Sequence, residues 1–171
     1  MCINKKPLYI AGTVVVCLIV MQTINTLTGP HFMLNLSSSE PLGIYRLRPF
    51  SGTLRRGEMV WMKAPQKAGA FIYERGWLPH GWPLLKHVKA VPGDSYCITD
   101  TALTVNGAFV GPVTDRDRKG QPLPRIRGYF DVTEGHFLPV ATNIANSFDG
   151  RYFGTVPASS IIAIATPVMI F

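Results

Sequence analysis

Three hydroxyl side chains stand in a row at Ser37, Ser38 and Ser39, shortly before Pro41 and Gly43. A serine hydroxyl attacks a carbonyl carbon efficiently only when a base lies within hydrogen-bond distance and nearby donors stabilise the oxyanion. A run of serines beside turn residues is equally typical of a linker. The run by itself therefore predicts either a nucleophile or a connecting segment.

The candidate bases are one lysine and the histidines. Members of a Ser-His-Asp triad have no fixed chain order, so spacing does not exclude the four histidines, which are His31, His80, His87 and His136. Lys86 follows two leucines in a segment typical of a strand. Burial there would lower the pKa of its amine, and a neutral amine can accept a proton from serine. The alternative is a surface lysine whose stem lies along a strand edge.

A third segment, residues 146–157, places polar, acidic, basic and aromatic side chains in a short loop bounded by glycines. Ser147 supplies a hydroxyl, and Asp149 and Arg151 are spaced to form an ion pair. Such a pair in an exposed β-turn would contribute little to stability. The segment indicates a site only in combination with the serine run and Lys86.

The sequence from His31 onward predicts a mainly β domain. Asn106-Gly107 is a strong hairpin signal, and Pro92-Gly93-Asp94 indicates a turn. The only helix expected in this domain covers residues 68–75, and residues 112–127 are expected to form a polar loop. The expected strands lie within residues 56–62, 85–91, 96–99, 103–105, 108–110, 136–141 and 161–165.

The N-terminal segment carries no charge between Pro7 and Pro30, after Lys5 and Lys6. Its apolar run approaches the roughly 20 residues that a bilayer requires. A cleaved signal peptide and a buried core helix are the alternatives, but no Ala-x-Ala cleavage site follows the run. We expect a single-pass anchor in the inner membrane. The two lysines would hold its tip in the cytoplasm. The domains are then 1–28, the tip and anchor, and 29–171, a periplasmic domain.

The composition excludes several classes of protein. Hydrophobic residues make up 47% of the 171 residues and charged residues 16%, which excludes a disordered chain. The 16 Gly and 14 Pro exclude a coiled coil. The three cysteines, Cys2, Cys17 and Cys97, are an odd number without CxxC spacing, which argues against a disulfide framework or a structural zinc site. The net charge of +7 suits an anionic membrane surface. If exposed, the side chains that would contact lipid there are Trp61, Trp77, Trp82, Arg46 and Arg48, and a place in the buried core is the alternative for each tryptophan.

Together these segments resemble the signal peptidase I family of membrane-anchored Ser-Lys proteases, and within it the TraF-type peptidases that process pilins in conjugative transfer. The nucleophile motif of that branch, Asn-x-(Ser/Thr)-x-Ser-x-Pro-x-Gly-x-Tyr, is matched throughout from Asn35 to Tyr45. The lysine motif, Lys-Arg-x-x-(Gly/Ala)-x-Pro-Gly-Asp, is matched from Lys86 to Asp94, with His87 in place of Arg. The last motif, Asn-Ser-x-Asp-(Ser/Gly)-Arg-Tyr-(Trp/Phe)-Gly-x-Val-Pro, is matched from Asn146 to Pro157.

The resemblance implies a role for each serine of the run. Ser39 is the implied nucleophile, because the TraF-type motif places its serine two residues before Pro41. Ser38 competes with it, because general signal peptidases place theirs three residues before the proline. Ser37 would then supply a hydroxyl to the oxyanion, together with the backbone N–H of Ser39.

The resemblance also implies roles outside the serine run. Lys86 would act as general base and later as general acid toward the leaving amine. Ser147 would orient the Lys86 amine. Asp149 and Arg151 would support the loop that carries Ser147. The fold it implies is a β-rich catalytic domain behind one transmembrane helix.

The function implied by the resemblance is that of a serine endopeptidase. It would remove the signal, the leader or a C-terminal segment of a conjugative pilin precursor or of another exported protein, and cyclisation of the pilin stays open. The alternatives are a general type I signal peptidase and a non-catalytic docking subunit of the transfer apparatus. The expected partners are this protein substrate and membrane lipid. No nucleic acid, cofactor or metal is expected.

Overall fold

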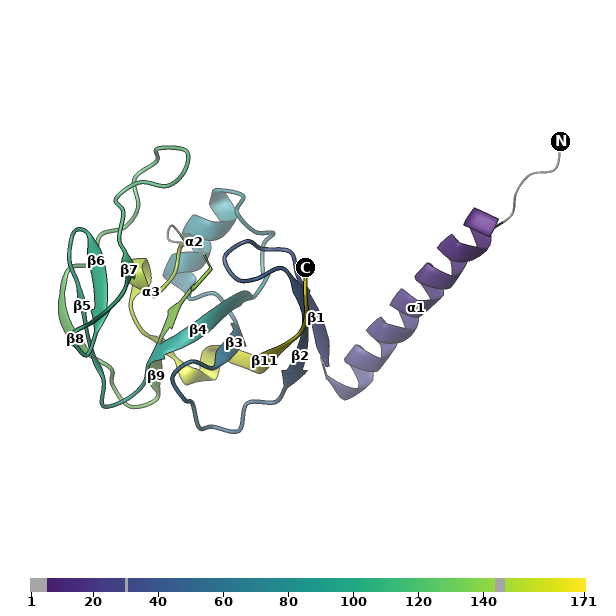
Figure 1. The fold of residues 1–171 in the computed structure, drawn as a ribbon, viewed down its shortest axis with the longest axis horizontal. Coiled ribbons are helices and arrows are strands. Elements are labelled where there is room, and N and C mark those ends of the chain that lie inside the picture. The colour runs from purple at the N-terminus through teal and green to yellow at the C-terminus, as the bar shows by residue number, and fades with distance from the viewer. Residues whose placement is uncertain (1–5, 30, 144–146) are drawn as a thin grey trace.

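The computed structural model describes residues 6–29, 31–143 and 147–171. A single helix, α1 (Lys6–Thr28), projects from a body built of two β-sheets, so the chain is mainly β (Figure 1). Two short helices and a 3-10 turn complete the body: α2 (Gln66–Glu74), α3 (Gly150–Phe153) and η1 (Ala158–Ser160).

The larger sheet carries Lys86 and the loop of the three serines. Its strands are all antiparallel and run in the order β1-β2-β11-β3-β4-β9-β10. Their bounds are β1 (Phe32–Asn35), β2 (Gly43–Arg48), β3 (Met59–Met62), β4 (Leu84–Ala90), β9 (His136–Val140), β10 (Val156–Pro157) and β11 (Ile161–Ile170). Side chains of β4 are almost continuously buried, as expected for a strand in the middle of a covered sheet.

The smaller sheet has the order β7-β6-β5-β8 and is also antiparallel. Its strands are β5 (Ser95–Ile98), β6 (Ala102–Val105), β7 (Ala108–Pro112) and β8 (Gly128–Asp131). The β6–β7 hairpin turns at Asn106 and Gly107, whose φ angles are 50° and 79°. Positive φ at both central residues is the geometry of a type I′ hairpin, which Asn-Gly favours.

Aromatic side chains join the two sheets into one hydrophobic core. Trp77 and Phe148 each pack against the apolar cluster of the small sheet and against the cluster beneath α2. The Phe148 ring lies 5.4 Å from the ring centroids of both Trp77 and Tyr152, and 5.7 Å from that of Phe71. Since Phe148 follows Ser147 in the chain, this packing fixes the segment that carries the expected orienting serine.

The mainly β fold expected from the sequence is confirmed, and α2 covers most of the helix expected at 68–75. The sequence patterns did not predict β1, β2, β8 or β10. The segment 146–157 is not a loop throughout, because it contains α3 and β10. These elements have two to six residues each, too few for a clear local pattern, and β2 and β8 also pair with strands far along the chain.

The buried core helix considered for the N-terminus is wrong, because every side chain that the structure describes on α1 is exposed. Among the described residues, no helix combines the length and the hydropathy needed to cross a membrane.

Gly43 marks the tightest contact between β2 and β11. A Cβ added there would collide with the backbone carbonyl oxygen of Met169. We expect Gly43→Ala to lower the free energy of unfolding by about 1–3 kcal/mol, the usual cost of overpacking. Thermal unfolding followed by circular dichroism measures the change. Gly12→Ala is the control, because nothing lies within 4 Å of the added Cβ in α1. Equal stability of the two variants would show that a Cβ at position 43 does not disturb the pairing of β2 with β11.

Candidate active site

The serine run lies in the loop between β1 and β2, and one buried amide holds this loop in shape. Asn35 Nδ2 donates to the carbonyl oxygens of Ser37, Glu40 and Pro41 at 3.0, 3.1 and 3.0 Å. Asn35 Oδ1 accepts from the backbone N–H of Ser37 at 3.1 Å. Only a side chain with both a donor and an acceptor can make this set of bonds. This explains why the motif opens on asparagine.

The far end of the same loop is fixed by Tyr45. Its side chain is fully buried, and its hydroxyl donates to the carbonyl oxygen of Pro41 at 2.7 Å. The serine run therefore does connect two strands, as the linker interpretation expected, but its loop is tied to the sheet at both ends. Asn35 and Tyr45 were visible in the sequence as motif positions, but nothing in the sequence gave them a role.

The three serines differ in their surroundings. Ser39 Oγ lies 3.1 Å from Ser37 Oγ, close enough for a hydrogen bond in either direction. The Ser38 side chain is exposed, and its carbonyl oxygen accepts from Asn143 Nδ2 at 3.0 Å. The geometry thus pairs the implied nucleophile with the implied oxyanion hydroxyl and leaves Ser38 outside that pair.

Lys86 is buried in β4 with only 3% of its surface exposed, so the surface-lysine alternative is wrong. Its Nζ donates to Ser147 Oγ at 2.8 Å. Burial lowers the pKa of Lys86, because a low-dielectric surrounding disfavours the ammonium form. The charges of Asp149 and Glu40 oppose this change, and Arg151 adds to it. The net lowering of the pKa makes the neutral amine, which can accept a proton, more accessible than in an exposed lysine.

Asp149 and Arg151 form a fully buried ion pair behind Ser147. Arg151 Nε and Nη2 donate to the two carboxylate oxygens at 2.9 and 2.8 Å. Asp149 also accepts from the backbone N–H groups of Ala141 and Arg151, and Arg151 Nη2 donates to the carbonyl oxygen of Ser147 at 3.3 Å. The pair is therefore the support of the Ser147 segment and not the exposed turn pair considered from the sequence.

One cleft with a volume of about 730 Å³ brings the candidate residues together. Ser37, Ser38, Ser39, Lys86 and Ser147 all line it, whereas Asp149 and Arg151 are buried and do not line it. Among the described residues, Ser39 Oγ is bonded to Ser37 Oγ and Lys86 Nζ to Ser147 Oγ, and no hydrogen bond joins Ser39 Oγ to Lys86 Nζ. The remaining wall is largely apolar and includes Met33, Leu36, Trp61, Ile72, Trp77, Leu78, Trp82, Leu84, Leu85 and Phe148.

The cleft also exposes one edge of β4. Strand β9 pairs with β4 only from His87 onward, where His87 faces Val140. Among the described residues, those from Leu84 to Lys86 therefore pair with β3 alone. An extended peptide can add to such a free strand edge through main-chain hydrogen bonds.

Nothing in the described part of the chain groups three or more His, Cys, Asp or Glu side chains in a way that could hold a metal ion. What the cleft presents is hydroxyl groups, an amine of lowered pKa, a largely apolar wall and the charged side chains of Asp117, Arg118 and Lys119. This set is suited to acyl transfer through a serine.

The family model described as "Signal peptidase, peptidase S26" matches residues 7–170. The chain belongs to this signal peptidase family. The family supports peptidase activity and implies that it is of the serine type. The resemblance stated from the three motifs is thereby confirmed at the level of the family.

Relatives of this signal peptidase family member come from conjugative systems. A conjugal transfer protein TraF of Agrobacterium tumefaciens (strain 15955) is 34% identical and covers 98% of this chain and 97% of its own. A plasmid transfer protein TraF of Escherichia coli is 32% identical over 79% of this chain and 81% of its own. Among solved structures, a signal peptidase I of Enterococcus faecalis V583 is 19% identical, with a TM-score of 0.41, over 67% of this chain and 97% of that chain.

The sequence reasoning missed three side chains close to the site: Glu40, Thr142 and Asn143. Glu40 occupies a variable position of the nucleophile motif, and Thr142 and Asn143 precede the last motif. Only long-range hydrogen bonds reveal them. Thr142 bonds to Glu40 across 102 residues of chain, and Asn143 bonds to Ser38 across 105 residues. Asn146, which opens the last motif, lies outside the described residues.

Removing the charge of Asp149 tests the buried pair. Asp149→Asn leaves the Arg151 guanidinium buried without a countercharge, so we expect the free energy of unfolding to fall by about 3–5 kcal/mol. Urea denaturation measures this loss. Asp115→Asn is the matched control, because it breaks the Arg125–Asp115 pair, whose side chains are 61% and 55% exposed. The control should lose about 1 kcal/mol or less. Similar losses from both variants would contradict the support role.

Proposed function

We propose that this family member is a serine endopeptidase in which Ser39 is the nucleophile and Lys86 the general base. The observation that carries the proposal is the buried Lys86 amine, bonded to Ser147 and lining the same cleft as Ser39. A lysine kept from solvent on its own would only destabilise the fold. A lysine that has lost its charge next to a cleft lined by serines is suited to proton transfer.

In the proposed mechanism, neutral Lys86 Nζ takes the proton of Ser39 Oγ as that oxygen attacks the scissile carbonyl carbon. The Ser37 hydroxyl, already 3.1 Å from Ser39 Oγ, turns to donate to the oxyanion together with the Ser39 backbone N–H. Loss of one such donor typically costs about 10²–10³ in rate. Protonated Lys86 then gives its proton to the leaving amine, and water hydrolyses the acyl-serine.

The proposed substrate is an exported protein of a conjugative transfer system, such as a pilin precursor. Relatives named as transfer proteins support this choice. The free edge of β4 and the apolar wall suit an extended, uncharged segment around the cleavage site. If a chain-terminal amine reached the acyl-serine in place of water, the same intermediate would give a cyclic product.

Co-expression with a candidate pilin precursor tests the dyad, with mass spectrometry as the readout. Ser39→Ala and Lys86→Ala should each reduce processing by several orders of magnitude, because a dyad acts as a unit. Ser38→Ala is the matched control and should stay active, because its exposed hydroxyl lies outside the Ser37–Ser39 pair. A product lighter than the linear chain by one water would show cyclisation.

Four outcomes would contradict this proposal. An active Ser39→Ala with an inactive Ser38→Ala would move the nucleophile by one residue. Full activity of Lys86→Ala would contradict the Ser-Lys mechanism and leave the histidines as the candidate bases. A wild-type protein that folds normally but processes no precursor would favour the docking subunit. Processing of general secretory precursors in place of the pilin would favour the general signal peptidase.

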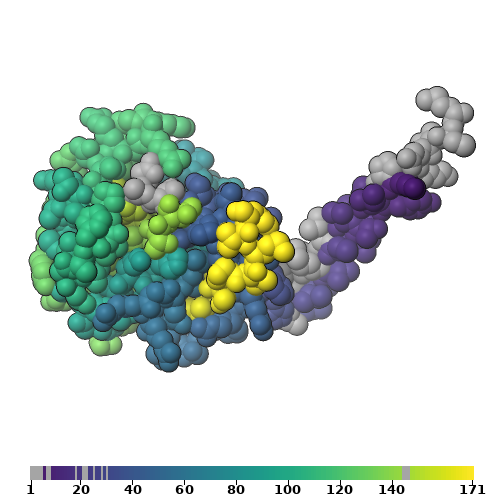
Figure 2. Space-filling view, in the orientation of Figure 1, coloured from purple at the N-terminus to yellow at the C-terminus, as the bar shows by residue number. Residues whose placement is uncertain are grey.

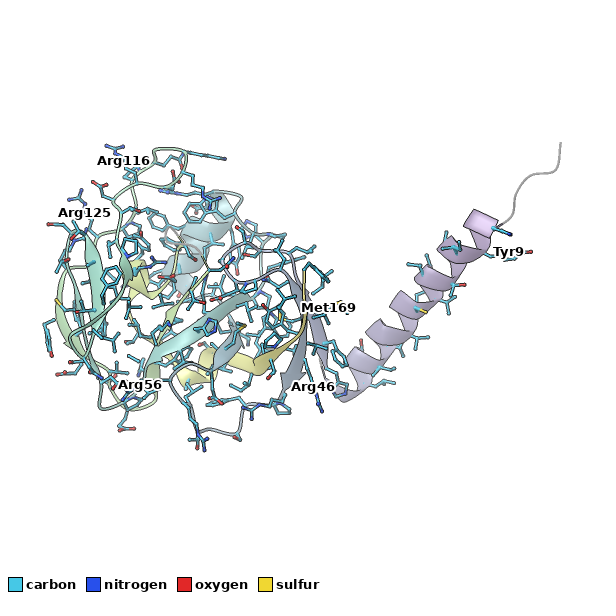
Figure 3. The ribbon with its side chains drawn as sticks, viewed as in Figure 1. Tyr9, Arg46, Arg56, Arg116, Arg125 and Met169 are labelled. Carbon is cyan, nitrogen blue, oxygen red and sulfur yellow. The ribbon has the colours of Figure 1, made fainter. Side chains whose placement is uncertain are left out.

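The single-pass inner-membrane anchor, with the catalytic domain in the periplasm, stays a prediction, and the exposed apolar surface supports it. The apolar side chains that the structure describes on α1 are exposed, up to 79% at Leu27. A second group of exposed apolar side chains lies on β1 and on the end of β11, on the side of the body that faces α1 (Figure 2). Arg46 and Met169 lie on this side in Figure 3, where Arg46 is near the base of α1. The second group comprises Phe32, Leu34, Val168, Met169, Ile170 and Phe171.

The tryptophans take different places from those expected at a lipid surface. Trp82 is 54% exposed, but Trp77 packs into the core that joins the sheets, and Trp61 is half-buried. All three line the cleft. They therefore suit contact with a substrate better than contact with lipid.

Charges placed in α1 test the anchor. We expect Val16→Lys with Val20→Lys to move the protein from the membrane fraction to the soluble fraction, because each lysine costs about 2.5–3.5 kcal/mol at the centre of a spanning helix. Val16→Leu with Val20→Leu is the control and should stay membrane-bound. Retention of the lysine variant on membranes would contradict anchoring by α1. The intact mass of the membrane-bound protein separately tests cleavage near Thr28.

A further inference from the structure

Glu40 directly follows the proposed nucleophile, and its side chain is fully buried. Burying a carboxylate is costly unless hydrogen bonds or a countercharge compensate for the lost water. Glu40 Oε1 lies 3.1 Å from His87 Nδ1, which directly follows the proposed general base on β4. One hydrogen bond between a carboxyl group and an imidazole therefore joins the loop of Ser39 to the strand of Lys86.

Thr142 adds the third segment of the site to this pair. Its Oγ1 donates to Glu40 Oε2 at 3.1 Å and lies 3.2 Å from His87 Nδ1. Its backbone N–H donates to Glu40 Oε1 at 3.3 Å. Thr142 lies two residues after the end of β9, in the stretch of chain that leads to Ser147.

We propose that Glu40, His87 and Thr142 form a positioning cluster that sets the distance between Ser39 and Lys86. Each of the three segments that carry Ser39, Lys86 and Ser147 contributes one member, bonded to the other two. None of the three members lines the cleft, so they do not touch substrate. They act through the neighbours to which the backbone joins them.

This cluster rests on the proposed function, and its effect on rate follows from geometry. Proton transfer needs Ser39 Oγ and Lys86 Nζ within hydrogen-bond distance. A displacement of about 1 Å at a reacting group can cost about 10²-fold in rate. A cluster that ties the two neighbours together limits such a displacement.

Glu40 also has an electrostatic effect on Lys86. A residue that is needed only for folding would not have this effect, so it distinguishes the two roles. Its charge raises the pKa of Lys86, against the larger lowering effect of burial. Asp149 acts in the same direction as Glu40, and Arg151 in the opposite direction. Removing the charge of Glu40 should therefore lower the pKa of Lys86 further. Because the neutral amine is the base, the acidic limb of the rate profile should move to lower pH.

The test measures kcat, KM and the pH–rate profile on purified full-length variants. We expect Glu40→Ala and His87→Ala to lower kcat by about 10²-fold with little change in KM. His87→Arg supplies N–H donors to Glu40 at the same position and should retain most of kcat. Glu40→Gln keeps the shape and should move the acidic limb to lower pH. Glu58→Gln is the control, because Glu58 pairs with Arg48 and does not line the cleft.

Unchanged kcat in Glu40→Ala and His87→Ala, or an unmoved limb in Glu40→Gln, would overturn the cluster. An NMR titration of the Lys86 amine in wild type and Glu40→Gln gives a second readout that needs no activity. If wild type is inactive, the proposed function fails, yet a lower titration midpoint in Glu40→Gln would still establish the coupling. An equal titration midpoint in both proteins would contradict the coupling between Glu40 and Lys86.

Discussion

The structure depends on keeping the amine of Lys86 out of water. Such a group is tolerated in a protein interior only when it is neutral or hydrogen-bonded, and this one has both a lowered pKa and a bond to Ser147 Oγ. The central position of β4 in the larger sheet provides the burial. The pairing with β9 begins only at His87, so the amine stays next to a cleft and is not sealed within the sheet.

The surroundings of Ser147 follow from that requirement. A serine that must accept from a buried amine cannot lie on a mobile turn. Phe148 anchors it among aromatic rings, and the Asp149–Arg151 pair holds its carbonyl oxygen. The pair is itself buried, and its carboxylate oxygens accept from backbone N–H groups as well as from the guanidinium. Such saturation by hydrogen bonds is what makes a buried ion pair tolerable.

The loop that carries Ser39 must also be held in a fixed position. After β1 ends, the side-chain amide of Asn35 donates to three carbonyl oxygens of the loop, which lie outside the two strands. Glu40 then connects this local structure to His87 on β4. Family membership and the relatives from transfer systems agree with a cleft built for peptide chemistry.

The sequence by itself determined the family, the mainly β class, the Asn106-Gly107 hairpin and the candidate residues Ser39 and Lys86. These are short-range signals, since a turn, an apolar alternation or a motif is complete within a dozen residues. Only the tertiary structure decided that Lys86 is buried and that Glu40 is part of the site. Burial depends on which strands cover β4, and the partner of Glu40 lies 47 residues away. No local pattern specifies such a contact, because it exists only once the sheet has brought the segments together.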